Sequence, residues 1–178
     1  MPRNLYKVQK LISKKRGKLD ALHENSRDSK RLQRASARND KLARAAAATL
    51  KARQVHVDRV SFFQECLKDI PGNLCLMDLA ELVEKYIHRD ASDIEQLQRE
   101  RRKGRPPSKR EEAIGQRTVG EEKEFMTGFW MPDLIQDEVR TKLLAWNGIW
   151  SSLSTIKFIR FTRDGAMRPS TFPPTGLS

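Results

Sequence analysis

The stretch SRDSKRLQRASARNDKLARAAAATLKARQVHVDRVSFFQECLKDI, residues 26–70, decides the fold because it contains no Gly or Pro and is rich in Ala, Arg, Lys, Leu and Gln. These residue types favour the α-helix. Ser26 is suited to cap the N-terminus of such a helix, and Asp28 is suited to stabilise its first turn through the helix dipole. The stretch therefore predicts one long helix over residues 26–70, which Pro71 ends.

Apolar residues of this helix recur at spacings of three, four or seven, so they share one face. Before Leu42 this apolar face nearly disappears, and Lys and Arg replace it. We therefore expect a C-terminal half that packs against the rest of the protein and a solvated, basic N-terminal half. The apolar residues are Leu42, Ala46, Leu50, Val57, Val60, Phe63, Leu67 and Ile70.

Shorter helices are predicted beyond Pro71, and the expected fold class is all-α. Ser108 and Glu111 have the spacing of a capping box, which opens a helix. The tripeptide Asp90-Ala91-Ser92 leaves open whether the segment before Gly104 is one helix or two. The expected helices cover residues 78–103, 108–127 and 133–147.

Residues near the C-terminus predict less regular structure. LSTIKFIRFT, residues 153–162, alternates and is rich in β-branched residues, so it predicts a short extended segment. We expect the helical domain to span residues 26–165 and a Pro-rich flexible tail to cover residues 166–178. Aromatic residues of small helical domains are usually buried, so three tryptophans are expected in the core rather than on a stacking surface. They are Trp130, Trp146 and Trp150.

The net charge of the chain is concentrated in its first third. The whole chain has 35 Lys and Arg against 23 Asp and Glu, a formal net charge of +12. Residues 1–60 hold 17 basic and 5 acidic side chains, whereas residues 61–178 hold 18 of each. Such a surplus favours polyanionic partners, nucleic acid ahead of an acidic membrane surface. Residues 1–25 have little apolar surface to bury, so we expect a basic arm that is disordered in the free protein.

The cations of this first third are the candidate nucleic-acid contacts. Lys14-Lys15-Arg16 alone would serve as a nuclear import signal, but the cations continue along the long helix, where we expect them to occupy several faces. Contacts of this kind neutralise phosphates, make affinity salt-dependent and read few bases. The candidates are Lys7, Lys10, Lys14, Lys15, Arg16, Lys18, Arg27, Lys30, Arg31, Arg34, Arg38, Lys41 and Arg44.

RRKGRPPSKR, residues 101–110, supports two interpretations. Its centre, Gly104-Arg105-Pro106, looks like the AT-hook, a short segment that binds the minor groove of A/T-rich DNA. This gives an alternative function, a DNA- or chromatin-binding protein. We favour the other interpretation, a Gly-Pro-Pro break before the Ser108 cap with a secondary phosphate-binding patch. The cations of this patch are Arg101, Arg102, Lys103 and Arg105.

Catalytic chemistry is not indicated by the sequence. The three histidines, His23, His56 and His88, are scattered, and no Gly-rich phosphate loop or catalytic motif occurs. Adjacent carboxylates such as Glu111-Glu112 are typical of solvated helix faces. We therefore expect no enzymatic activity, no cofactor, no metal site and no small-molecule substrate.

Cysteine usage and hydropathy bear on the cellular compartment in which the protein is expected. Cys66 and Cys75 match no zinc-site spacing and are expected to be reduced core residues, with a disulfide between them as the less favoured alternative. No apolar run of about 18 residues occurs, and residues 1–30 lack the apolar region of a secretory signal. An amphipathic membrane-surface protein is a third hypothesis, but the most basic stretch lacks a bulky apolar face, so no membrane partner is expected.

Three blocks of the sequence resemble the translation-machinery-associated protein 16 family, which is assigned to biogenesis of the large ribosomal subunit. HENSRDSKRLQR, residues 23–34, is similar to the family pattern of His-Pro, one residue, Ser or Gly, then Arg-Lys and a basic helix. DLAELVEKYIHRDASDIEQL, residues 78–97, resembles its acidic-apolar helix pair. SKREEAIGQR and EFMTGFWMPDLI, residues 108–117 and 124–135, resemble its next helix and the glycine-aromatic turn that follows.

The resemblance implies a helical protein without enzymatic activity that binds nuclear pre-60S particles. Its partners would be ribosomal RNA, ribosomal proteins and other assembly factors, and its location the nucleus, both nucleolus and nucleoplasm, with the cytoplasm as a further site. The resemblance adds His23 to the candidate contacts and supports Arg27 and Arg34. This chain has Glu24 where the family pattern has proline and Asp28 where it has lysine.

Overall fold

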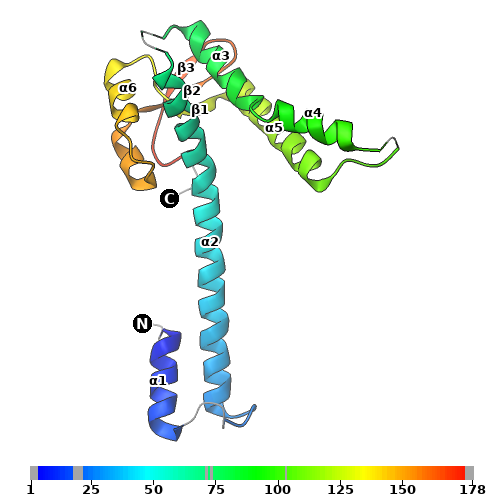
Figure 1. The fold of residues 1–178 in the computed structure, drawn as a ribbon. Coiled ribbons are helices and arrows are strands. Elements are labelled where there is room, and N and C mark those ends of the chain that lie inside the picture. Colours follow the sequence, from blue (N-terminus) through cyan, green and yellow to red (C-terminus); the bar gives the residue numbers. More distant parts are fainter. Residues whose placement is uncertain (1–3, 18–21, 71, 73, 103, 175–178) are drawn as a thin grey trace. The chain divides into compact units, whose positions relative to one another are not determined.

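The computed structural model describes residues 4–17, 22–70, 72, 74–102 and 104–174. In this part of the chain most residues are helical, and three short strands form one antiparallel sheet (Figure 1). The chain divides into two compact units, Met1–Ala52 and Arg53–Ser178. The prediction of an all-α fold is correct for the dominance of helix and wrong in that it missed the sheet.

The first unit contains helix α1, Leu5–Arg16, in a segment that the sequence predicted to be disordered. Asn4 Oδ1 accepts a hydrogen bond from the Tyr6 backbone N–H at 3.2 Å, which caps the helix. Val8 and Ile12, four residues apart, are only 3% and 2% exposed. The expectation of disorder is therefore corrected for Leu5–Arg16, because this apolar pair gives the helix a face to bury.

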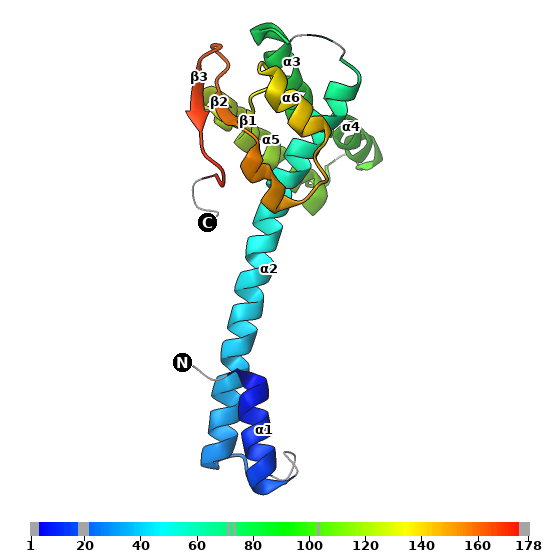
Figure 2. The same ribbon diagram turned by 90° about the vertical axis from the view of Figure 1, so that its left-hand side faces the viewer.

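Helix α2, Arg27–Lys68, begins in the first unit and ends in the second. Ser26 Oγ accepts a hydrogen bond from the Ser29 N–H at 3.0 Å, which is the cap expected from the sequence. The first turns of α2 lie beside α1 in both views (Figures 1 and 2). Leu32 and Ala35 are half-buried on α2 in this region.

The apolar face of α2 is fully buried only from Val60 onward. Val60 and Phe63 are 0% exposed, whereas Leu42 and Leu50 are 59% and 66% exposed. The prediction that this face packs against the protein is therefore wrong for the part of the face that carries Leu42 and Leu50. Residues 37–48 are all exposed. Five alanines between residues 43 and 48 explain why the helix persists there, because Ala has the highest intrinsic helix propensity.

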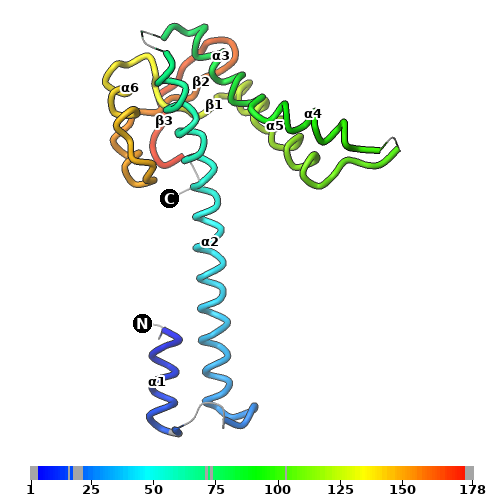
Figure 3. The backbone as a smooth tube through the Cα atoms, viewed as in Figure 1, coloured from blue at the N-terminus to red at the C-terminus, as the bar shows by residue number. Residues whose placement is uncertain are grey.

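Shorter helices make up most of the second unit. The segment 78–103, for which one helix or two remained open, contains most of one helix, α3, and the whole of a second, α4. The Ser108 hydroxyl accepts a hydrogen bond from the Glu111 N–H, and the Glu111 carboxylate accepts one from the Ser108 N–H, as the capping box predicts. Helices α4 and α5 lie side by side (Figure 3). The bounds are α3 Leu76–Ile87, α4 Ala91–Glu100, α5 Lys109–Thr127, α6 Asp137–Leu144 and the 3-10 helix η2 Trp150–Thr155.

The three strands pair in the order β1-β2-β3, with both pairs antiparallel. Strand β2 falls within the predicted extended segment, although that segment begins in η2 rather than in a strand. Strand β3 lies where a flexible tail was expected, so this expectation is wrong for that stretch because pairing with β2 orders it. The strands are β1 Phe129–Pro132, β2 Phe158–Phe161 and β3 Met167–Ser170.

Gly128 allows β1 to follow α5 directly. Its φ is +136°, and a Cβ placed on it would lie 3.2 Å from Cβ of Arg160 on the neighbouring strand. A residue with a side chain would be strained in both respects. The turn therefore depends on glycine, and it places Phe129 and Trp130 at the centre of the core.

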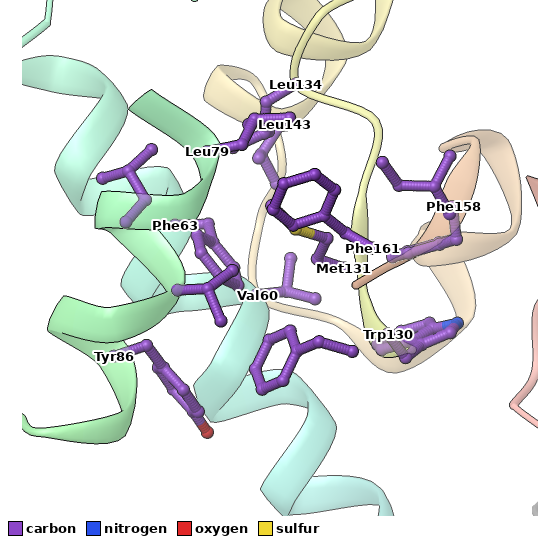
Figure 4. Packing of buried hydrophobic residues seen from close by; sticks show 14 of the residues in the cluster. Val60, Phe63, Leu79, Tyr86, Trp130, Met131, Leu134, Leu143, Phe158 and Phe161 are labelled. Atoms are coloured by element: carbon purple, nitrogen blue, oxygen red, sulfur yellow. The ribbon is translucent and has the colours of Figure 1, made fainter. Parts of the chain in front are cut away.

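Aromatic side chains fill the core of the second unit (Figure 4). Trp130 stacks on Phe158 with ring centroids 4.2 Å apart and planes 11° apart. Trp130 and Trp146 are 1% and 7% exposed, which confirms the core interpretation for these two tryptophans, and Trp150 is half-buried. Both cysteines are free; Cys66 is in the core as expected, whereas Cys75 is exposed.

Candidate nucleic-acid interface

Most basic residues in the first half of α2 form one continuous stripe. At 3.6 residues per turn, six of them fall within an arc of about 100° and extend for about 21 Å along the helix axis. All six side chains are exposed. We call this set the α2 stripe: Arg27, Lys30, Arg31, Arg34, Arg38 and Lys41. Arg44, also exposed, follows about 40° beyond the edge of this arc.

The prediction that the cations occupy several faces of the long helix is therefore corrected. Spacings of three and four residues return each cation to nearly the same direction. The half-buried residues Leu32 and Ala35 point about 150° and 90° away from the centre of the α2 stripe. Asp28, which lies 4.0 Å from Lys15 of α1, points about 110° away from the same centre. The stripe therefore faces largely away from α1, although Arg31 at its edge lines a cavity shared with α1.

Helix α1 carries a second stripe, on its outer side. Lys7, Lys10 and Lys14 are exposed and fall within an arc of about 60°. Val8 and Ile12, which are buried, point about 150° away from them. We call the three lysines the α1 stripe. The α1–α2 pair thus presents cations on two outward faces, one on each helix.

The remaining predicted contacts of the first unit lie near its helix ends. Lys15 is 4.0 Å from the Asp28 carboxylate, so the acidic residue in the basic motif faces a lysine of α1. A cavity of about 310 Å³ is lined by Lys14, Lys15, Asp28, Arg31 and apolar residues of α1. His23 is exposed, and its Nδ1 accepts a hydrogen bond from the Asn25 N–H at 3.3 Å.

The secondary patch lies in the second unit, between α4 and α5. Arg101, Arg102 and Arg105 line one cavity of about 440 Å³ together with Pro106 and Ser108. The Arg101 guanidinium forms an ion pair with Glu111 at 3.2 Å. Arg102 and Arg105 are exposed. The structure thus brings these three arginines together, while Lys103, Lys18 and the Arg16 side chain lie outside the described residues.

Two arginines elsewhere in the second unit pair with partly or fully buried carboxylates. Arg59, 4% exposed, donates two hydrogen bonds of 2.8 Å to Glu124 and lies 4.1 Å from the centroid of the Phe129 ring. Arg89 forms the same two-bond pair with Glu121, at 2.7 and 2.8 Å, and stacks on Tyr86 at 3.9 Å. These arginines hold the fold together and are not available to a polyanion.

The charges of the Arg59–Glu124 pair are stabilised by one another. Burial opposes ionisation of both groups, but the hydrogen bonds and the attraction between them outweigh it. The pKa of Glu124 is consequently lowered and the pKa of Arg59 is raised. Glu124 also accepts a hydrogen bond from the Trp130 N–H at 3.1 Å, which ties the pair to β1.

The described residues also bear on two other kinds of site. Within them, no group of three or more His, Cys, Asp or Glu is placed to hold a metal ion. Among the helices that the structure describes, none has the length and apolar character needed to cross a membrane.

The fold and the two stripes define a class: a mainly helical protein with a small sheet and an exposed, strongly cationic pair of helices. Residues 18–163 match the family model of translation machinery-associated protein 16. The chain is 35% identical to translation machinery-associated protein 16 of Saccharomyces cerevisiae over 167 residues, covering 92% of this chain and 93% of the relative. It is 28% identical to the Mus musculus protein of that name over 153 residues, covering 82% and 68%. The chain belongs to the translation machinery-associated protein 16 family.

Two features of this interface were missed by the sequence analysis. Helix α1 was not predicted, although Asn4 before it and the pair Val8 and Ile12 indicate a capped amphipathic helix. The single direction of the α2 stripe was also missed, although a count of three- and four-residue spacings gives it. Both signals were present in the sequence.

Proposed function

We propose that this protein is a non-enzymatic assembly factor of the large (60S) ribosomal subunit. It binds pre-60S particles through phosphates of ribosomal RNA and through neighbouring ribosomal and assembly-factor proteins. The observation that carries the proposal is the pair of exposed cationic stripes on the outer sides of α1 and α2. The family name, which refers to the translation machinery, supports a ribosomal partner.

The stripes suit a site between two phosphate backbones. A single flat polyanion would engage one outward face and leave the other in water. Cations on both outer sides of the helix pair instead allow phosphates to be neutralised on both, each with release of counterions. Sequence readout is expected to be slight, because phosphate contacts fix position and carry no base information directly.

Under this proposal the second unit acts mainly as a scaffold and adds little net positive charge. Its basic and acidic residues nearly balance, and Arg59 and Arg89 are committed to internal carboxylates. It would position the helix pair and supply surfaces for protein neighbours. We place the protein in the nucleolus and nucleoplasm, where large-subunit precursors mature, and the cytoplasm remains a second location for testing by fluorescence microscopy.

Sedimentation of a tagged chain tests the proposal. We expect the parent protein to migrate with large-subunit precursors on a sucrose gradient. Reversal of Arg31, Arg34 and Arg38 to Glu should shift most of it to the free fraction while leaving the thermal unfolding midpoint of the protein unchanged, because these side chains are exposed.

A matched control carries the same charge change in the second unit. Lys85, Lys123 and Arg168 are also exposed, and their reversal to Glu should leave sedimentation close to that of the parent. A parent chain that never migrates with large-subunit precursors would contradict the proposal. Equal loss of association in both triple variants would show that net charge, rather than the α2 stripe, governs binding.

The AT-hook alternative is tested with the same protein. Arg105→Ala should leave binding to an rRNA fragment largely intact, since the α1 and α2 stripes are unchanged. Loss of binding to an A/T-rich duplex in Arg105→Ala, with no effect of the Arg31, Arg34 and Arg38 reversals, would favour the DNA-binding interpretation instead.

A further inference from the structure

An apolar strip lies on α2 within the first unit. Leu42, Ala46 and Leu50 follow one another at four-residue spacing and fall within an arc of about 80°. Leu42 is 59% exposed and Leu50 is 66% exposed. We call these three residues the leucine strip. Two leucines so exposed on one helix face indicate a surface that is covered when the protein is assembled.

The leucine strip continues the interface that α1 already occupies. Leu32 and Ala35, half-buried beside α1, precede the strip on nearly the same face of α2. α1 runs along only the first turns of α2 (Figures 1 and 2). The strip is thus the uncovered continuation of a helix–helix contact surface, and a second helix fits it for the same reason that α1 fits the preceding turns.

The leucine strip points in a different direction from the α2 stripe. Its centre, Ala46, points about 110° away from the centre of the α2 stripe. A phosphate backbone seated on the stripe would therefore leave the strip uncovered. The strip itself has no polar side chain, so it offers nothing to a phosphate or a base edge. These observations favour a protein over RNA as its occupant.

The charge of the first unit specifies the kind of protein. Residues 1–52 hold 15 Lys and Arg against 4 Asp and Glu, a surplus of 11 positive charges. Arg38 precedes Leu42 by one turn and borders the strip. A second copy of this chain would bring an equal positive charge alongside, which opposes pairing of two strips. An acidic segment is attracted by the same field.

We propose that the leucine strip binds an amphipathic helix of a partner protein, with Leu, Ile or Val at helical spacing on one face and Asp or Glu beside them. The partner helix lies along α2 as α1 does, and its carboxylates face Arg38 and the neighbouring cations. This assignment does not depend on which polyanion the α1 and α2 stripes bind.

Crosslinking from two neighbouring alanines tests the assignment. Ala46 lies in the leucine strip, whereas Ala48, two residues later, points about 160° away and lies in line with the α2 stripe. A diazirine-bearing phenylalanine analogue replaces either residue in the full chain, and living cells are irradiated before purification under denaturing conditions. The carbene that forms inserts into protein and RNA alike, so both kinds of adduct are scored.

The expected result differs between the two positions. From position 46 we expect a protein adduct whose attached peptide is apolar at three- and four-residue spacing and acidic. From position 48 we expect RNA. Leu50→Ser should reduce the position-46 adduct at least fivefold, whereas Leu11→Ser, at another exposed leucine of the first unit, should leave it unchanged.

Each failure has a separate meaning. RNA attached at position 46, a peptide without acidic residues, no adduct there, or indifference of the adduct to Leu50→Ser would overturn the leucine-strip proposal. Absence of RNA at position 48 would count against the proposed function and leave the strip proposal standing. Circular dichroism of Leu50→Ser and Leu11→Ser confirms equal helix content before crosslinking.

Discussion

The two units of this protein use the same residue types in opposite ways. In the second unit, Arg59 and Arg89 turn inward, stack on aromatic rings and bond to Glu124 and Glu121. In the first unit, the arginines and lysines of both stripes lie on outer faces of two helices. Basic residues therefore form internal ion pairs in one unit and remain exposed on the other. Changes in the two units should separate folding from binding.

The largest expected effect is on the core of the second unit. Leu82, 6% exposed on α3, belongs to the buried cluster. Leu82→Asp places a charge there without a partner and should cost more than about 5 kcal/mol, enough to unfold a typical domain. Denaturant unfolding should show no cooperative transition for the second unit.

A control on the same helix tests whether burial of the leucine causes the expected loss of stability. Leu76 also lies on α3 but is 44% exposed, so Leu76→Asp should change the unfolding free energy by less than about 1 kcal/mol. Parental stability in Leu82→Asp would show that Leu82 is not buried by the packing of α3.

The next effect concerns the inward-facing arginine. Glu124→Ala removes the partner of Arg59 and leaves a guanidinium that is 4% exposed without its carboxylate. The unfolding free energy should fall by about 3–5 kcal/mol. Chemical denaturation measures the change, and the double variant Arg59→Met/Glu124→Leu should recover much of the loss because no charge remains buried. A double variant weaker than the single one would contradict this account.

The salt dependence of RNA affinity should distinguish an exposed arginine of the α2 stripe from an arginine that is paired within the second unit. Arg34 belongs to the α2 stripe, whereas Arg110 pairs with Asp93 at 2.6 Å. With an rRNA fragment as ligand, Arg34→Gln should reduce the slope of log affinity against log salt by about 1. Arg110→Gln should leave the slope unchanged. Equal slopes for both variants and the parent would remove Arg34 from the interface.

The smallest effect is a dependence of stability on pH. Burial lowers the pKa of His56, with a further decrease from the positive charge of Arg59 and a smaller opposing effect of Glu124. The unfolded chain then binds more protons than the folded one, so stability is full above pH of about 6.5 and falls as the pH decreases below it. Thermal unfolding across pH 5–8 should show this fall in the parent and in His88→Asn but not in His56→Asn.

Local signals in the sequence predicted most of the helices, and the dependence of the sheet on long-range contacts explains why it was missed. Ser26 and the Ser108–Glu111 box act within one turn, so their caps follow from spacing alone. The sheet could not be predicted in the same way. Strand β3 has mostly exposed side chains, and its pairing with β2 orders a segment whose Pro content indicates a loose tail.

The candidate interface was predicted in composition but not in geometry. The cations of α1 and α2 were identified, but their gathering into two stripes was not, although their three- and four-residue spacings indicate it. Exposure of Leu42 and Leu50 could not be predicted, since apolar residues at helical spacing indicate burial whether the covering surface belongs to the same chain or to a partner.

Among the described residues of α1 only Val8 and Ile12 are buried, while both helices carry strong positive charge. Mutual repulsion within this hairpin weakens as dissolved ions screen it. A high salt concentration should consequently strengthen the packing of α1 on α2. By the same screening it should lower the affinity of the pair for any polyanion. The packing of α1 on α2 and the proposed binding of a polyanion should thus respond to rising ionic strength in opposite directions.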